Sequence, residues 1–239
     1  MRPSGFRETC PGSQDSEHVL VAHGSRHADG VRTIAELAAA VSARVGRVRT
    51  AFVDVLGPNP AEVLADLTGP AIVVPAFLAS GFHVRTDLPE RIAESGHRDA
   101  TVTRALGPDH ALAEVMSARL TEVGWRPGDV VIMAAAGSSD PCACRELYLA
   151  AGMLADRVGE VHLGCVATGT PRVRDIVRVL RAAGRRRIFI ASYLLAPGLF
   201  HNRLHDCGAT AVTAPLGVHP GVVDLVAARF ARLAVGAAG

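Results

Sequence analysis

The chain of 239 residues contains no lysine, so all 25 of its Lys and Arg positions are arginine. Chemistry that depends on a lysine is therefore excluded: Schiff-base formation, covalent attachment of pyridoxal phosphate, and the lysine of a phosphate-binding P-loop. Arginine suits the planar, bidentate recognition of carboxylates. Codon bias in a GC-rich genome is the simpler explanation for most of these positions.

Aromatic residues, clustered cysteines and long apolar runs are also scarce. Only 4% of the residues are aromatic while 49% are apolar, which is typical of aliphatic α/β cores. Five scattered cysteines, with no signal-peptide pattern, predict a reduced, cytoplasmic protein. No apolar run has the length to cross a bilayer, and the net charge of +2 comes without a long basic run. We therefore expect neither a membrane nor a nucleic acid as partner.

Short apolar, β-branched runs alternate with stretches of helical period. The pattern predicts strands at residues 19–22, 48–55, 71–77, 101–106, 129–135, 160–167, 187–195 and 209–213. Helices are expected between the strands, and a helix at 109–123 closes the first half. This order predicts an α/β fold with parallel sheets covered on both faces. The boundaries inferred are a flexible segment at 1–17 and two domains at 18–124 and 125–239.

Two pairs of similar segments indicate that the halves arose by gene duplication. The turn His23–Arg26 (HGSR) follows the first strand of the first half, and Ala136–Ser139 (AGSS) follows the first strand of the second. Further along, Phe77–His83 is matched by Leu194–His201. The first turn carries an imidazole where the second carries a methyl group. This difference predicts chemistry in the first half that the second has partly lost.

The polar residues of the first half follow successive strands. His23 follows the first strand, Asp54 ends the second, and His83 follows the third in a glycine-rich loop. Ligands bind beyond the carboxyl ends of parallel strands, so we expect these side chains to converge. Two imidazoles and a carboxylate suit Fe²⁺, Co²⁺, Ni²⁺ or Zn²⁺, and they equally suit proton transfer. A backbone-bonded histidine would explain His23 alone, but Ala136 in the matched turn favours a functional role.

Other interpretations of Asp54 and of the serines in the two turns stay open. Asp54 is also placed to cap the turn that contains Pro58, and Cys165 stands at the corresponding place in the second half. Ser25 and Ser138 lack the G-x-S-x-G setting of a hydrolase nucleophile, and no G-x-G-x-x-G follows the first strand. We expect the two serines to cap the following helices, with the turn amides free for an anionic group.

The HGSR turn, the strand end Phe52–Asp54 and the segment Phe77–Pro89, with its G-F-H-x-x-x-D-x-P pattern, together resemble the sirohydrochlorin chelatases of the SirB/CbiX type. The resemblance continues through Ala136–Pro141 and Leu195–Gly198. It implies two duplicated ferrochelatase-like domains, each a parallel sheet flanked by helices, facing a central cleft. It also implies a class II chelatase, which inserts Fe²⁺ or Co²⁺ as substrate into a tetrapyrrole without ATP and without an organic cofactor. A single chain with both halves would act as a monomer with an internal pseudo-dimer.

The resemblance also assigns roles to individual residues. His23 and His83 fall on the metal-handling histidines, and Asp54 falls at an acidic position often filled by the longer Glu. Arg26 and Arg85, which flank the histidines, are expected to bind the carboxylates of the macrocycle. The remaining residues expected to contact substrate are Ser25, Gly81, Ser138 and His201. The second half would then form the opposite wall of the cleft.

Two further functions are compatible with the same sequence. A non-catalytic protein could carry metal or tetrapyrrole between two lobes, and a chelatase could act on another porphyrin of haem synthesis. We favour iron insertion into sirohydrochlorin, which yields sirohaem.

Overall fold

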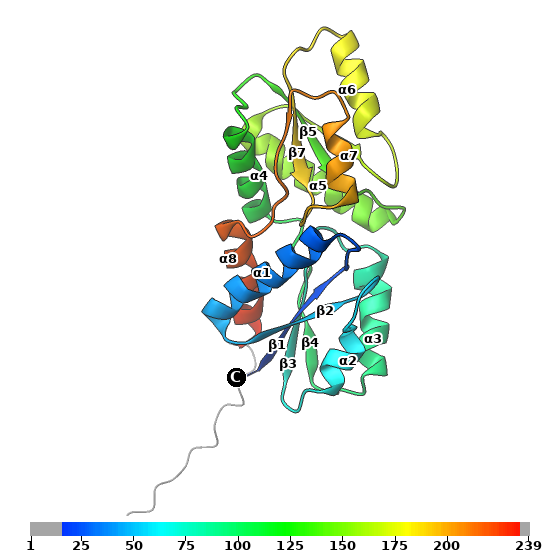
Figure 1. The fold of residues 1–239 in the computed structure, drawn as a ribbon, viewed down its shortest axis with the longest axis vertical. Coiled ribbons are helices and arrows are strands. Elements are labelled where there is room, and N and C mark those ends of the chain that lie inside the picture. The colour runs from blue at the N-terminus through cyan, green and yellow to red at the C-terminus, as the bar shows by residue number, and fades with distance from the viewer. Residues whose placement is uncertain (1–15, 235–239) are drawn as a thin grey trace, which may run out of the picture.

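The computed structural model describes residues 16–234, which form two lobes, each built on a four-stranded parallel sheet (Figure 1). The first sheet has the strand order β2-β1-β3-β4, and the second has the corresponding order β6-β5-β7-β8. The strands are β1 (Glu17–Ala22), β2 (Val48–Phe52), β3 (Ala71–Pro75), β4 (Ala100–Val102), β5 (Val130–Ala135), β6 (Val161–Cys165), β7 (Ile188–Tyr193) and β8 (Ala211–Val212). The predicted α/β class is confirmed. The segment expected to be flexible, 1–17, lies outside the described residues except for its last two, and Glu17 already belongs to β1.

Helices connect the strands and cover both faces of each sheet (Figure 1). The helices are α1 (Ala28–Val45), α2 (Pro60–Ala65), the π-helical turn η1 (His83–Asp87), α3 (Leu88–Glu94), α4 (His110–Glu122), α5 (Pro141–Val158), α6 (Val173–Ala182), α7 (Leu199–His205) and α8 (Pro220–Ala234). The strands β3, β5 and β7 are buried along their whole length, as expected for strands between two helical layers. No helix among residues 16–234 is long and apolar enough to cross a membrane.

The strand register fixes which residues of the two lobes correspond. Ala22 pairs with Phe52, and Ala135 pairs with Cys165, so His23 and Ala136 occupy equivalent places, as the duplication predicted. The same register shows that Cys165 corresponds to Phe52. The expected match of Cys165 with Asp54 is therefore wrong by two residues.

Four local features also differ from what the sequence predicted. Strand β2 ends at Phe52, so Asp54 lies in a bend beyond the strand. Asp54 does not cap the next helix either, because Asn59 does so through a capping box with Glu62. His83 begins the helical turn η1, where a loop was expected. Helix α7 was missed altogether.

The last helix of each half packs on the sheet of the other half. Helix α4 lies against α5 and β7 of the second lobe, while α8 lies against α1 and β3 of the first (Figure 1). The largest apolar cluster therefore includes both sheets, with Met116 of α4 and Phe230 of α8 fully buried in it. We expected α4 to close the first half, but it covers the second. The domain boundaries at residues 124 and 125 stay a prediction.

A buried ion pair joins the two exchanged helices. Arg229 of α8, whose side chain is 4% exposed, donates to Asp109 at 2.9 Å, and Asp109 caps α4 by accepting from the Ala111 amide. Burial raises the pKa of Asp109, but the hydrogen bonds from Arg229 and Ala111 and the nearby positive charges lower it by more. The net result is a pKa below the ordinary value of an aspartate.

Candidate functional site

A cleft of about 900 Å³ opens between the carboxyl ends of the two sheets, and both lobes line it. Most of the residues that the sequence singled out are among its lining. These are His23, Ser25, Arg26, Asp54, Gly81, His83, Ser138 and His201. Arg85 is the exception, since it lines a separate cavity of about 570 Å³ beside Arg145 on α5.

The two glycine-serine turns have the same backbone shape. Gly24 has a φ of +96°, and a Cβ there would lie 2.1 Å from the carbonyl oxygen of Asp54. Gly137 has a φ of +87°, and its Cβ would lie 1.7 Å from the carbonyl oxygen of Thr168. Only glycine tolerates this combination of positive φ and close approach. Each turn therefore places the residue before it, His23 or Ala136, at the cleft.

Neither serine is the N-cap of the helix that follows its turn. Each serine instead accepts a hydrogen bond from the N-cap residue of that helix. Ser25 Oγ accepts from the amide of His27 at 3.0 Å, and Ser138 Oγ accepts from the amide of Asp140 at 3.0 Å. Those two amides belong to the N-cap residues of α1 and α5. The expectation that Ser25 and Ser138 are N-caps is thus wrong by two residues. Both hydroxyl groups still border the cleft.

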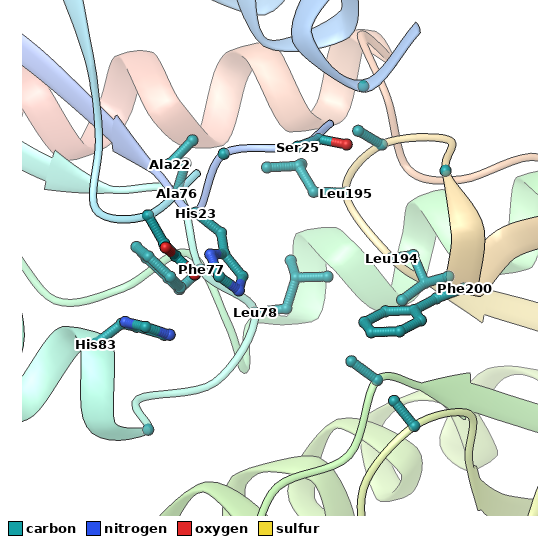
Figure 2. Close-up of a pocket in the computed structure, with 18 of the residues that line it drawn as sticks. Ala22, His23, Ser25, Ala76, Phe77, Leu78, His83, Leu194, Leu195 and Phe200 are labelled. Carbon is teal, nitrogen blue, oxygen red and sulfur yellow. The ribbon is translucent and has the colours of Figure 1, made fainter. Parts of the chain in front are cut away.

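His23 and His83 form a close pair of imidazoles. Their ring centroids lie 4.6 Å apart with an interplanar angle of 43°. Figure 2 shows both rings projecting from the first lobe into the same opening, with Phe77 beside them. His23 is exposed and the side chain of His83 is 34% exposed, so both rings reach solvent. The structure thus brings together the two residues that the resemblance assigns to metal handling.

Asp87 supports His83 from within the same helical turn. Its Oδ2 lies 3.0 Å from Nδ1 of His83, and its Oδ1 lies 3.6 Å from Nε of Arg91. A carboxylate on Nδ1 favours the tautomer that keeps the proton there and leaves the Nε2 lone pair free for a metal. Sequence reasoning gave Asp87 no role. The signal was the i, i+4 spacing of His83 and Asp87, which places both on one helical face.

Asp54 lies at the cleft without joining a metal-ligand cluster. Its side chain is exposed, and Oδ1 accepts from the amide of Val55 at 2.8 Å. Within residues 16–234, no group of three or more His, Cys, Asp or Glu side chains is arranged to hold a metal ion. A metal bound by two imidazoles keeps other coordination positions open, which suits transfer rather than storage.

The second lobe offers an apolar group where the first offers His83. Pro75 and Ser192 occupy equivalent places in β3 and β7. His83 lies eight residues after Pro75, and Phe200 lies eight residues after Ser192, so Phe200 is the counterpart of His83. Phe200 and Leu194 face the cleft opposite His83 (Figure 2).

His201, the neighbour of Phe200, is bonded to the protein instead. Its Nε2 donates to the carbonyl oxygen of Thr213 at 2.9 Å. Burial lowers the pKa of His201, which favours the neutral ring at pH 7. Since Ala136 replaces His23 and His201 is bonded to the backbone, the second lobe has no counterpart of the His23–His83 pair among the cleft residues that the structure describes.

Two duplicated parallel sheets that face one cleft, with a pair of imidazoles on the first lobe's wall, define a two-lobed α/β protein with an open cleft. The sequence profile of the CbiX family matches residues 17–123 and 130–233, so the chain belongs to that family.

Curated relatives and solved structures agree with this membership. The chain is 25% identical to the sirohydrochlorin ferrochelatase of Priestia megaterium over 56% of this chain, a match that spans about half (53%) of that relative's length. It is 30% identical to the sirohydrochlorin cobaltochelatase of Methanococcoides burtonii over 44% of this chain and 94% of that protein. The structure of SirB from Bacillus subtilis with Fe³⁺ is similar with a TM-score of 0.80 at 22% identity, covering 94% of this chain and 98% of SirB. The last likeness shows that the two-lobed fold is shared.

Proposed function

We propose that the protein inserts a divalent metal, Fe²⁺ or Co²⁺, into sirohydrochlorin without ATP or an organic cofactor. Membership of the CbiX family and two chelatase relatives of that specificity support this activity. The observation that carries it is the pair His23 and His83, 4.6 Å apart in a cleft that both lobes line. Iron insertion, which yields sirohaem, is the favoured reaction.

The chemistry requires groups that can release a metal and accept protons. Insertion replaces two pyrrole N–H protons of the macrocycle by the metal, so the site must take up two protons per turnover. Neutral imidazoles bind borderline divalent ions and accept protons near neutral pH. In this proposal His23 and His83 present the metal to the macrocycle and then receive the protons, and Asp54 passes protons toward solvent.

The two walls of the cleft differ, which supports metal delivery to the macrocycle from the first lobe alone. The first lobe supplies the imidazoles, whereas Ala136, Leu194 and Phe200 of the second lobe give an apolar wall for the face of the ring. Binding energy from such a wall can hold a macrocycle off planarity and expose its nitrogen lone pairs. The second lobe would then act as the template and the first as the metal donor.

Polar groups around the rim would bind the carboxylate arms. Arg26 is exposed at the cleft, and Arg85 lies on the neighbouring cavity with Arg145. Guanidinium groups bind carboxylates through paired hydrogen bonds. The turns at Ser25 and Ser138, the backbone at Gly81 and the ring of His201 are proposed as further contacts. We also propose that the enzyme works in the cytoplasm as a monomer with an internal pseudo-dimer.

Steady turnover tests this function. Purified protein, sirohydrochlorin and either Fe²⁺ or Co²⁺ are mixed anaerobically, and the absorbance change of the macrocycle is followed. His23→Ala and His83→Ala should each reduce the rate at least about 100-fold, since each removes a group that touches the metal. His201→Ala, the comparison variant from the second lobe, should cost far less than either of these changes. A single turnover without recycling would indicate the alternative, a carrier, and preference for another porphyrin would indicate the other chelatase.

A further inference from the structure

The loop between β3 and η1, residues 76–82, carries His83 and is held by the second lobe. The amide of Ser80 donates to Oε2 of Glu146 on α5. The hydroxyl of Tyr193, at the end of β7, donates to the carbonyl oxygen of Leu78 at 2.9 Å. One backbone donor and one backbone acceptor of this short loop are therefore satisfied from across the cleft.

Tyr193 and Glu146, the two residues that bond to this loop, differ in how deeply they are buried in the second lobe. Tyr193 is 1% exposed, and burial raises the pKa of its hydroxyl, which stays a donor. Glu146 is half-buried at the edge of the cavity that Arg85 and Arg145 line, and no salt bridge described within residues 16–234 includes it. The amide of Ser80 is its hydrogen-bond partner. A half-buried carboxylate that accepts from the backbone amide of a loop in the other lobe is placed to hold that loop.

The other half of the molecule provides an internal comparison. Ser80 and Pro197 lie at the same distance beyond the paired residues of β3 and β7, so Pro197 is the equivalent of Ser80. Proline has no amide hydrogen to donate. Glu146 is likewise equivalent to Thr33 of α1, because each lies ten residues beyond His23 or its counterpart Ala136. Thr33 Oγ1 donates to the carbonyl oxygen of Asp29 within its own helix.

The Glu146–Ser80 bond thus exists on one side of the pseudo-symmetric cleft, and that side carries the histidine pair. The donor and the acceptor differ together, since the symmetry-related place has Pro197, which lacks an amide hydrogen, and Thr33, which lacks a carboxylate. A bond needed merely to join the lobes would be expected at both places.

We propose that Glu146 is a positioning residue of the metal site: from the second lobe it fixes the loop that places His83 opposite His23. The inference rests on the function proposed above. The geometry supplies the link, because the carbonyl oxygen of Gly81, next to Ser80, accepts the first hydrogen bonds of η1, from the amides of Val84 and Arg85 at 3.1 Å each. Freeing Ser80 lets the start of η1 shift, and with it the ring of His83. Displacements near 1 Å in such a site can cost about 100-fold in rate.

The test compares variants of the full chain in Co²⁺ binding, in kinetics and in melting temperature. Glu146→Ala should weaken Co²⁺ binding about tenfold, as loss of a supporting group does at other metal sites, and should raise KM for the metal more than KM for sirohydrochlorin. Glu146→Gln keeps an acceptor oxygen and should remain within about threefold of the wild type. Thr33→Ala, the matched change in the other half, should leave both constants unaltered.

A double-mutant cycle identifies the partner. Ser80→Pro introduces the residue that the second half already carries and removes the donor without touching Glu146. Combined with Glu146→Ala, it should add less than about twofold to the loss from either change alone, because both remove one bond.

Two results would overturn the inference. One is wild-type Co²⁺ affinity in Glu146→Ala, whether or not its melting temperature falls. The other is full multiplicative loss in the double variant. Should the wild-type protein bind Co²⁺ but not metallate sirohydrochlorin, the proposed function fails, while Co²⁺ affinity still decides the role of Glu146.

Discussion

Replacing Asp87 by alanine should weaken metal binding without removing either imidazole. The carboxylate is 16% exposed and lies 3.0 Å from Nδ1 of His83, so it holds both the orientation and the tautomer of the ring. Partners of this kind contribute about 10- to 100-fold to metal affinity or activity at other histidine sites. That range corresponds to about 1.4–2.7 kcal/mol of binding free energy. We therefore expect the Kd for Co²⁺ to rise by 10- to 100-fold in Asp87→Ala.

Titration with Co²⁺, followed by its visible absorption bands, measures this directly. Asp87→Asn, which keeps an acceptor oxygen but loses the charge, should fall between the wild type and Asp87→Ala. Asp29→Ala removes an exposed carboxylate that pairs with Arg32 on α1 and serves as the matched control, with unaltered affinity expected. A Kd for Asp87→Ala within twofold of the wild type, in a folded protein, would refute the supporting role.

Further predictions concern the fold. Arg229→Ala removes the buried partner of Asp109 and leaves the more exposed Arg104, 3.1 Å away, as its remaining ion-pair partner, so it should destabilise the protein by about 1.5–3 kcal/mol in denaturant unfolding. An effect below about 1 kcal/mol would contradict a structural role for the buried pair. The pKa of Asp109 in the folded state lies below its ordinary value near 3.9. The contribution of Asp109 to the free energy of unfolding is therefore complete above about pH 3.9 and is lost as the pH falls through the folded-state pKa. Asp109→Asn should accordingly flatten the loss of stability on acidification. Gly24→Ala and Gly137→Ala should each destabilise the folded protein by about 2 kcal/mol or more. Only Gly24→Ala should also reduce Co²⁺ affinity, because the histidine pair lies in the first lobe. Equal effects of the two changes on Co²⁺ affinity would contradict a metal site in that lobe alone. Light scattering should give the mass of one chain, 24.9 kDa.

The sequence pattern was sufficient for the sheets and for the histidine pair. Continuous apolar runs such as Val130–Ala135 identify buried parallel strands directly, and the repeated glycine-serine turn marks where each first strand ends. Ala136 in the matched turn favoured a role for His23, whereas His83 was found from its place after the third strand and from the resemblance to the chelatases. The comparison depends on aligning the two halves correctly. The alignment of the second strands was off by two residues, so Cys165 was matched with Asp54 instead of Phe52.

The missed features depend on contacts between distant segments. Residues Val53–Val55 continue the apolar run of β2, but the chain bends there as the carbonyl oxygen of Asp54 packs over Gly24. Helix α7 and the turn η1 are short and follow glycine-rich loops, so neither shows a helical period that a sequence window can detect. Glu146 and Tyr193 act on a loop far away in sequence, a relation that no local pattern contains.

The exchange of α4 and α8 has a consequence for synthesis of the protein. The first sheet is complete once β4 has been made, but α8, which covers one of its faces, is the last helix of the chain. An emerging first half would therefore expose the apolar face of its sheet for as long as the ribosome is still translating the second half. At about 5–20 residues per second, the roughly 130 residues from β4 to α8 correspond to an exposure of about 7–26 s. The chain thus cannot finish its first half early, because α1 alone covers this face of the sheet until α8 has been made.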